Sequence, residues 1–140
     1  MNWARRVRNV LLIAALGSIG SLVASCASPV SRADQEAVAQ GKALYHTLAC
    51  DSCHGLDAVS SIRTYAPPHN HVRATAEQRI QAADYTGQAT TAAAYMRESI
   101  FDPKIYVVDG YQHLRFGMVS YAHLSECEIN ALVQFLLQQE

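Results

Sequence analysis

The stretch Cys50-Asp51-Ser52-Cys53-His54 constrains this chain more than any other feature, because Cys-x-x-Cys-His is the attachment sequence of a c-type haem. Two thiols three residues apart on one turn can add to the two vinyl groups of a porphyrin. The pattern therefore assigns thioether formation to Cys50 and Cys53 and proximal ligation of the iron to His54. The other ring nitrogen of this histidine is expected to be held by a backbone carbonyl, which fixes the ring.

Two other interpretations of the cysteine pair compete with haem attachment. A Cys-x-x-Cys pair can be a thiol-disulfide redox centre in a βαβ fold, or half of a four-ligand zinc site. The other two cysteines, Cys26 and Cys127, are 101 residues apart and offer no second ligand pair. No thioredoxin-like alternation of strands and helices surrounds the pair either. Both observations favour a single covalently attached haem c.

The first 25 residues are typical of a secretory signal, with three arginines before an apolar stretch and small residues after it. The sequence Val23-Ala24-Ser25-Cys26 resembles the end of a bacterial lipoprotein signal, in which the cysteine is acylated and becomes the new N-terminus. Ordinary cleavage and an uncleaved signal anchor are the alternatives, and each also places the following domain outside the cytoplasm. We expect a signal peptide over 1–25, a lipidated Cys26 with a flexible tether over 26–33, and one domain over 34–140.

Charge and length exclude several classes of protein. Without residues 1–25 the chain keeps 8 Lys and Arg against 12 Asp and Glu, a formal charge of −4. It has no basic run that could serve as a nucleic-acid footprint, and no later apolar stretch long enough to span a bilayer. The remaining length suits one small domain with a modest core, so a buried porphyrin would supply much of its apolar contact.

The sequence predicts a helix at each end of the domain. Apolar residues recur every three or four positions over 34–49, and this helix runs into the haem motif. A second helix begins after Ser125, which has a glutamate three residues later and an apolar stripe from Ile129 to Leu137. We expect the two helices to pack together, with Gly41 permitting close approach and Tyr45 beside Phe135.

In the middle of the chain, the sequence predicts one clear helix, one short helix and an irregular loop. Residues 90–101 are helical in pattern and end before Pro103. The stretch 56–72 contains Pro67-Pro68 and is expected to be an irregular loop, and a short helix is expected to be capped by a Thr75 to Gln78 capping box. Strand signals are weak throughout, so the sequence predicts an all-α domain.

The order of these features resembles class I cytochromes c across roughly residues 34–139: a helix ending in Cys-x-x-Cys-His, a middle helix, a late methionine and a C-terminal amphipathic helix. The second half, with Tyr95-Met96-Arg97-Glu98-Ser99-Ile100, the segment 106–111, Met118 and Leu124-Ser125, is similar to the cytochrome domain fused to subunit II of bacterial haem-copper oxidases and to stand-alone membrane-bound relatives. The resemblance implies the class I cytochrome c fold, with the N- and C-terminal helices packed crosswise, a middle helix and haem-wrapping loops.

The resemblance also implies roles for residues outside the motif. Met118, 64 residues after His54, is the implied distal ligand, with His113 as the rival. A carbonyl of Pro67 or Pro68 is implied as the acceptor for the proximal histidine. For the remaining candidate residues we expect structural roles. Met96 should pack in the core, and Cys127 should be a half-buried free thiol. The loop histidines, His69, His71 and His123, should be solvated.

The function implied is single-electron transfer without bond chemistry, by a protein that a lipidated Cys26 anchors outside the cytoplasm, in the periplasm or on the outer face of the cytoplasmic membrane. Its natural partners would be membrane redox complexes, such as a quinol-oxidising complex, a terminal oxidase or a photosynthetic acceptor, and it could be a subunit of one. The alternative is a gas-binding or peroxidatic haem protein, in which Met118 is displaced and the sixth coordination position of the iron is open.

Overall fold

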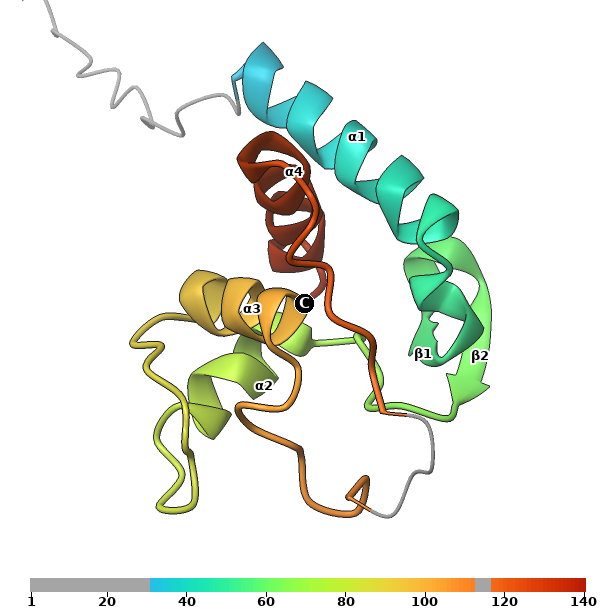
Figure 1. Cartoon of the computed structure of the whole chain (residues 1–140). Helices are drawn as coiled ribbons and strands as arrows, with labels where there is room; N and C mark the ends of the chain where they lie inside the picture. The colour runs from blue at the N-terminus through green and yellow to red at the C-terminus, as the bar shows by residue number, and fades with distance from the viewer. Residues whose placement is uncertain (1–30, 113–116) are drawn as a thin grey trace, which may run out of the picture.

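Four α-helices and one small sheet make up the computed structural model, which describes residues 31–112 and 117–140. The helices are α1 (Arg32–Thr47), α2 (Val72–Arg79), α3 (Ala92–Phe101) and α4 (Glu126–Leu137) (Figure 1). None of these helices is long and apolar enough to cross a membrane. The prediction of a mostly helical domain with packed terminal helices is confirmed.

Helix α1 begins two residues before the predicted start at residue 34. Ser31 is its N-cap, and a capping box joins the Ser31 hydroxyl and the Asp34 carboxylate to each other's backbone N–H groups. The prediction had assigned this serine to the flexible tether. The helix ends at Thr47, and Ala49 then adopts a left-handed conformation with φ 56°, which turns the chain into the attachment motif.

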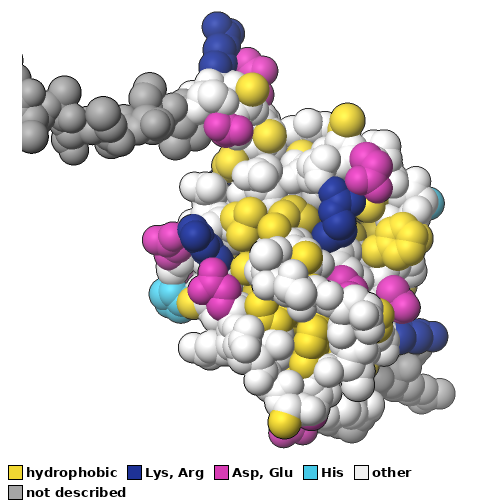
Figure 2. All heavy atoms as spheres, turned by 90° about the vertical axis from the view of Figure 1, so that its left-hand side faces the viewer, with side chains coloured by type: hydrophobic (Ala, Val, Ile, Leu, Met, Phe, Trp, Pro, Cys, Tyr) yellow, Lys and Arg dark blue, Asp and Glu magenta, His cyan; other side chains and the backbone are white. Residues whose placement is uncertain are grey.

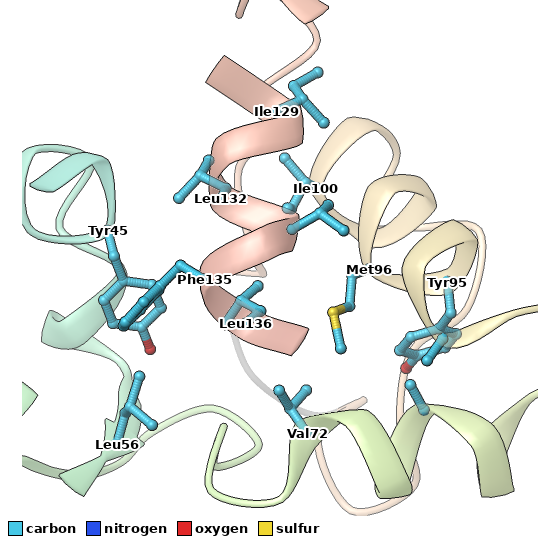
Figure 3. Packing of buried hydrophobic residues seen from close by; sticks show 13 residues of the cluster. Tyr45, Leu56, Val72, Tyr95, Met96, Ile100, Ile129, Leu132, Phe135 and Leu136 are labelled. Carbon is cyan, nitrogen blue, oxygen red and sulfur yellow. The ribbon is translucent and has the colours of Figure 1, made fainter. Parts of the chain in front are cut away.

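Helices α1 and α4 make the most extensive contact between elements of the described chain. Gly41 permits it, because a Cβ at this position would overlap the Ala131 carbonyl oxygen and lie 2.7 Å from Phe135 Cβ. One turn later, the Tyr45 ring meets the Phe135 ring edge to face, with centroids 5.5 Å apart (Figure 3). The predicted pairing of the terminal helices is therefore confirmed at the residues expected to carry it.

The capping prediction for α2 was wrong. The helix begins at Val72, three residues before Thr75, and its N-cap His71 is left-handed with φ 58° and makes no side-chain cap hydrogen bond. The Thr75 hydroxyl instead donates to the His71 carbonyl from within the first turn. Helix α3 agrees with the sequence prediction, with Thr91 as its N-cap.

The stretch predicted as irregular loop contains a short antiparallel hairpin. Strand β1 (His54–Leu56) pairs with β2 (Ser61–Thr64), with His54 opposite Thr64 and Leu56 opposite Ser61, and the register shifts between these pairs. The side chain of Ile62 is 91% exposed. This hairpin has no regular alternation of buried and exposed apolar residues, which explains why periodicity did not predict it.

The core lies where α2, α3 and α4 meet. Met96 is 3% exposed and points between these helices, so its predicted packing role is confirmed (Figure 3). The core also contains Tyr95, Ile100, Ile129, Leu132 and Leu136. On the face shown in Figure 2, cationic and anionic side chains are interspersed, without a block of one charge.

Candidate functional site

The attachment motif forms a tight turn between α1 and the hairpin. Residues Cys50–Ser52 make one turn of 3-10 helix, and His54 starts strand β1. The Ser61 hydroxyl on β2 lies 2.8 Å from the Asp51 carbonyl and 2.9 Å from the His54 carbonyl, and donates to them. The hairpin that the sequence did not predict therefore holds both ends of the turn in place.

The His54 ring is fixed by the predicted backbone acceptor. Its Nδ1 lies 2.6 Å from the Pro67 carbonyl oxygen, so the N–H at that position donates and Nε2 is left free to bind a metal. Of the two prolines considered, Pro67 is the acceptor. Burial lowers the pKa of His54, which favours the neutral imidazole that coordinates iron.

An apolar cavity adjoins the attachment turn. Its volume is about 30 Å³. Helices α1, α3 and α4, the motif and the segment around Met118 all contribute to its wall. The residues lining it are Tyr45, Leu48, Cys50, His54, His69, Ile100, Met118, Tyr121, Leu132 and Leu136. Apolar walls with a thiol, an imidazole and a thioether fit the needs of a covalently attached haem.

Met118 lies in the wall of the same cavity as His54, as a distal ligand would need to. Its side chain is 38% exposed, and the next residue, Val119, is 63% exposed. The rival ligand His113 lies outside the described residues, as do the predicted signal peptide and Cys26.

The surroundings of Cys50 differ from those of a reactive redox thiol. Cys50 and Cys53 are free thiols, and burial, reinforced by the Asp51 carboxylate, raises the pKa of the Cys50 thiol to about 11. Thiol-disulfide enzymes instead depend on cysteines with a lowered pKa. Within residues 31–112 and 117–140, no group of three or more His, Cys, Asp and Glu residues is placed to hold a metal ion. Cys127 is exposed, which corrects the prediction of a half-buried thiol.

His69 was missed as a site residue. It was predicted to be solvated, as His71 and His123 were, and those two are exposed. His69 instead lines the cavity and stacks on His54, with ring centroids 3.9 Å apart and planes inclined by 17°. The signal available in the sequence was its position two residues after Pro67, because a carbonyl bound to His54 brings the following residues to the same ring.

Tyr121 was also missed. It lines the cavity, and its hydroxyl donates to the Leu48 carbonyl at 2.9 Å, which ties the segment after Met118 to the end of α1. The two residues are 73 positions apart, and no local pattern in the sequence marks the contact.

In the comparison with protein families, the family model described as cytochrome c matches residues 38–140. This span contains the attachment motif, the cavity and all four helices apart from the first turns of α1. The comparisons with curated proteins and with solved structures gave no match.

Proposed function

The chain belongs to the cytochrome c family, and from this premise we propose that it is a membrane-tethered monohaem electron carrier. Members of the family bind haem c covalently and are typically electron carriers outside the cytoplasm, with other redox proteins as partners. The observation that carries the proposal is that residues of the Cys-x-x-Cys-His turn and Met118, 64 residues after His54, line the same cavity.

In this proposal, Cys50 and Cys53 form the two thioether bonds and His54 is the proximal ligand of the iron. The hydrogen bond from His54 Nδ1–H to the Pro67 carbonyl supports the assignment, because it orients Nε2 and increases the electron density on the ring. The Ser61 hydroxyl keeps the turn that carries these three residues in one conformation.

Met118 is the distal ligand in this proposal. Its place in the cavity wall supports the assignment, whereas Met96 is buried in the core away from the cavity wall. A bound haem supplies a one-electron couple at its iron, and methionine ligation raises the potential of that couple. The chain's own contribution would be an apolar wall that excludes water and two side chains, His54 and Met118, that would hold the iron.

The choice between a carrier and a gas-binding or peroxidatic protein can be made on the purified protein. A carrier undergoes reversible one-electron oxidation and reduction, and its reduced form does not take up carbon monoxide because Met118 fills the sixth position. Rapid carbon monoxide binding by the reduced protein would contradict the carrier proposal and support an open sixth site.

Tethering is proposed from the sequence alone, through a signal peptide over 1–25, an acylated Cys26 and a short tether before Ser31. Partners in the same membrane follow from such an anchor, and we propose a quinol-oxidising complex as donor and a terminal oxidase or photosynthetic complex as acceptor. Cys26→Ser should move the haem protein from the membrane fraction to the soluble fraction. Full retention of the variant in membranes would contradict lipidation.

A further inference from the structure

Three aromatic side chains form a column beneath the attachment turn. Tyr45 on α1 contacts the His69 ring edge to face, with centroids 5.7 Å apart, and its hydroxyl lies 2.9 Å from His69 Nδ1. His69 in turn stacks face to face on His54, at 3.9 Å between centroids. The column therefore runs from the packed surface of α1 to the imidazole that carries the attachment site.

The direction of the hydrogen bond in this column can be assigned. Within the described parts of the chain, the Tyr45 hydroxyl makes no other hydrogen bond, so His69 Nδ1 is the acceptor available to the phenol proton. The hydroxyl donates to His69 Nδ1, which places the His69 proton on Nε2. His69 is thus held in one tautomer and one ring orientation.

Tyr45 and His69 are each held by further contacts of their own. Tyr45 is 1% exposed and packs against Phe135 of α4. The backbone N–H of His69 donates to the Gly55 carbonyl at 2.8 Å, immediately after His54 in strand β1. His69 therefore has little freedom to move away from the ring on which it stacks.

The two restraints on the His54 ring act in different directions. The bond from Nδ1–H to the Pro67 carbonyl holds one edge of the ring, but a single hydrogen bond leaves rotation of the ring plane soft. A parallel ring at 3.9 Å blocks that rotation on one face, because tilting would bring the two rings into overlap. Stacking on His69 thus restricts the rotation of the His54 ring plane, which the hydrogen bond to the Pro67 carbonyl does not.

We propose that His69 is a positioning residue that sets the plane of the His54 imidazole, and that Tyr45 is its anchor on α1. The inference rests on the proposed role of His54 as proximal ligand. Orientation of the imidazole plane determines how its orbitals overlap with those of the iron, so the pair Tyr45 and His69 tunes the electronic structure at the site. Because Tyr45 also packs against Phe135, the orientation of the His54 ring is linked to the packing of α1 against α4.

The test is proton NMR of the oxidised haem protein, because the order and spread of the shifted haem methyl resonances follow the orientation of the axial ligands. His69→Leu should change this spread, and Tyr45→Phe, which removes only the hydroxyl, should change it in the same direction by less. In the His69→Leu background, Tyr45→Phe should add no further change, since the two residues act as one unit.

Tyr85→Phe is the matched control, because the Tyr85 hydroxyl donates to Glu98 at 2.5 Å, away from the cavity wall. It should leave the methyl resonances unchanged. The inference is overturned if His69→Leu and Tyr45→Phe both keep the resonances of the unaltered protein, or if Tyr45→Phe has its full effect in the absence of His69. An unaltered protein without covalent haem would overturn the proposed function as well, and haem staining after denaturing electrophoresis separates the two failures.

Discussion

The two sides of the cavity are built differently. On the attachment side, His54 is held by the Pro67 carbonyl, stacked on His69 and fixed in a turn that Ser61 closes. In another part of the cavity wall, Met118 lies in a stretch, 117–120, without helix or strand and is 38% exposed. The contrast indicates that the polypeptide's own contacts fix the His54 side chain directly, whereas they hold the Met118 segment only through the neighbouring Ser120 and Tyr121.

The largest expected effect comes from removing the covalent link on the attachment side. The double variant Cys50→Ser with Cys53→Ser should lose all haem staining on denaturing gels, because no thioether can form. The exposed Cys127 provides the control, and Cys127→Ser should stain as strongly as the unaltered protein. Retained staining in the double variant would contradict the assignment of these thiols.

The next largest effect is expected at the contact between α1 and α4, which supports the attachment side of the cavity. Gly41→Ala should lower the free energy of unfolding of the haem protein by about 3 kcal/mol, because the added methyl overlaps the Ala131 carbonyl at the α1–α4 contact. Gln40→Ala, at the exposed neighbouring position, should change it by less than about 0.5 kcal/mol. Equal denaturation midpoints in urea for the two variants would show that this contact is not tightly packed.

A matched pair of serines compares the two sides directly. Ser61→Ala removes a partly buried hydroxyl that serves two carbonyls, and should cost about 2 kcal/mol in the free energy of unfolding. Ser120→Ala, two residues from Met118, removes an exposed hydroxyl that donates to the Phe101 carbonyl at 2.6 Å and should cost about 0.5 kcal/mol. A larger cost for Ser120→Ala would reverse the comparison.

A smaller effect than that of Ser61→Ala is expected at the start of α4. Ser125→Ala removes the N-cap and should cost about 1 kcal/mol in the free energy of unfolding at neutral pH. Hydrogen bonds from Ser125 lower the pKa of Glu128, so the carboxylate stabilises the fold above the ordinary glutamate pKa and this contribution is lost as pH falls through the lowered value. The difference in the free energy of unfolding between the unaltered protein and Ser125→Ala, measured in urea, should therefore become smaller as the pH is lowered. A difference that does not change with pH would contradict the capping box.

The parts of the fold that the sequence predicts are those specified locally. The cap at Ser125, the stripe of α4 and the motif at Cys50 are each readable from a few consecutive residues. Gly41 and Tyr45 could be paired with Phe135 because both helices were already located. The Pro67 acceptor came from resemblance, and the geometry agrees with it.

The parts that were not predicted depend on contacts distant in sequence. Strands β1 and β2 are too short to show a period, and they form because Ser61 and the backbone bind the attachment turn. His69 was read as solvated because its neighbours are polar, yet Tyr45, 24 residues earlier, supplies a buried hydroxyl for it. The start of α2 at a left-handed His71 uses no side-chain cap and has no local signature.

The central claim is that Met118 completes the site that His54 begins, and proton NMR of the reduced protein tests it most directly. A methionine bound to iron has its methyl resonance shifted far upfield by the porphyrin ring current. We predict one such resonance that is lost in Met118→Leu and kept in Met96→Leu, since Met96 is a core residue. Absence of an upfield methyl resonance, or its survival in Met118→Leu, would contradict the account.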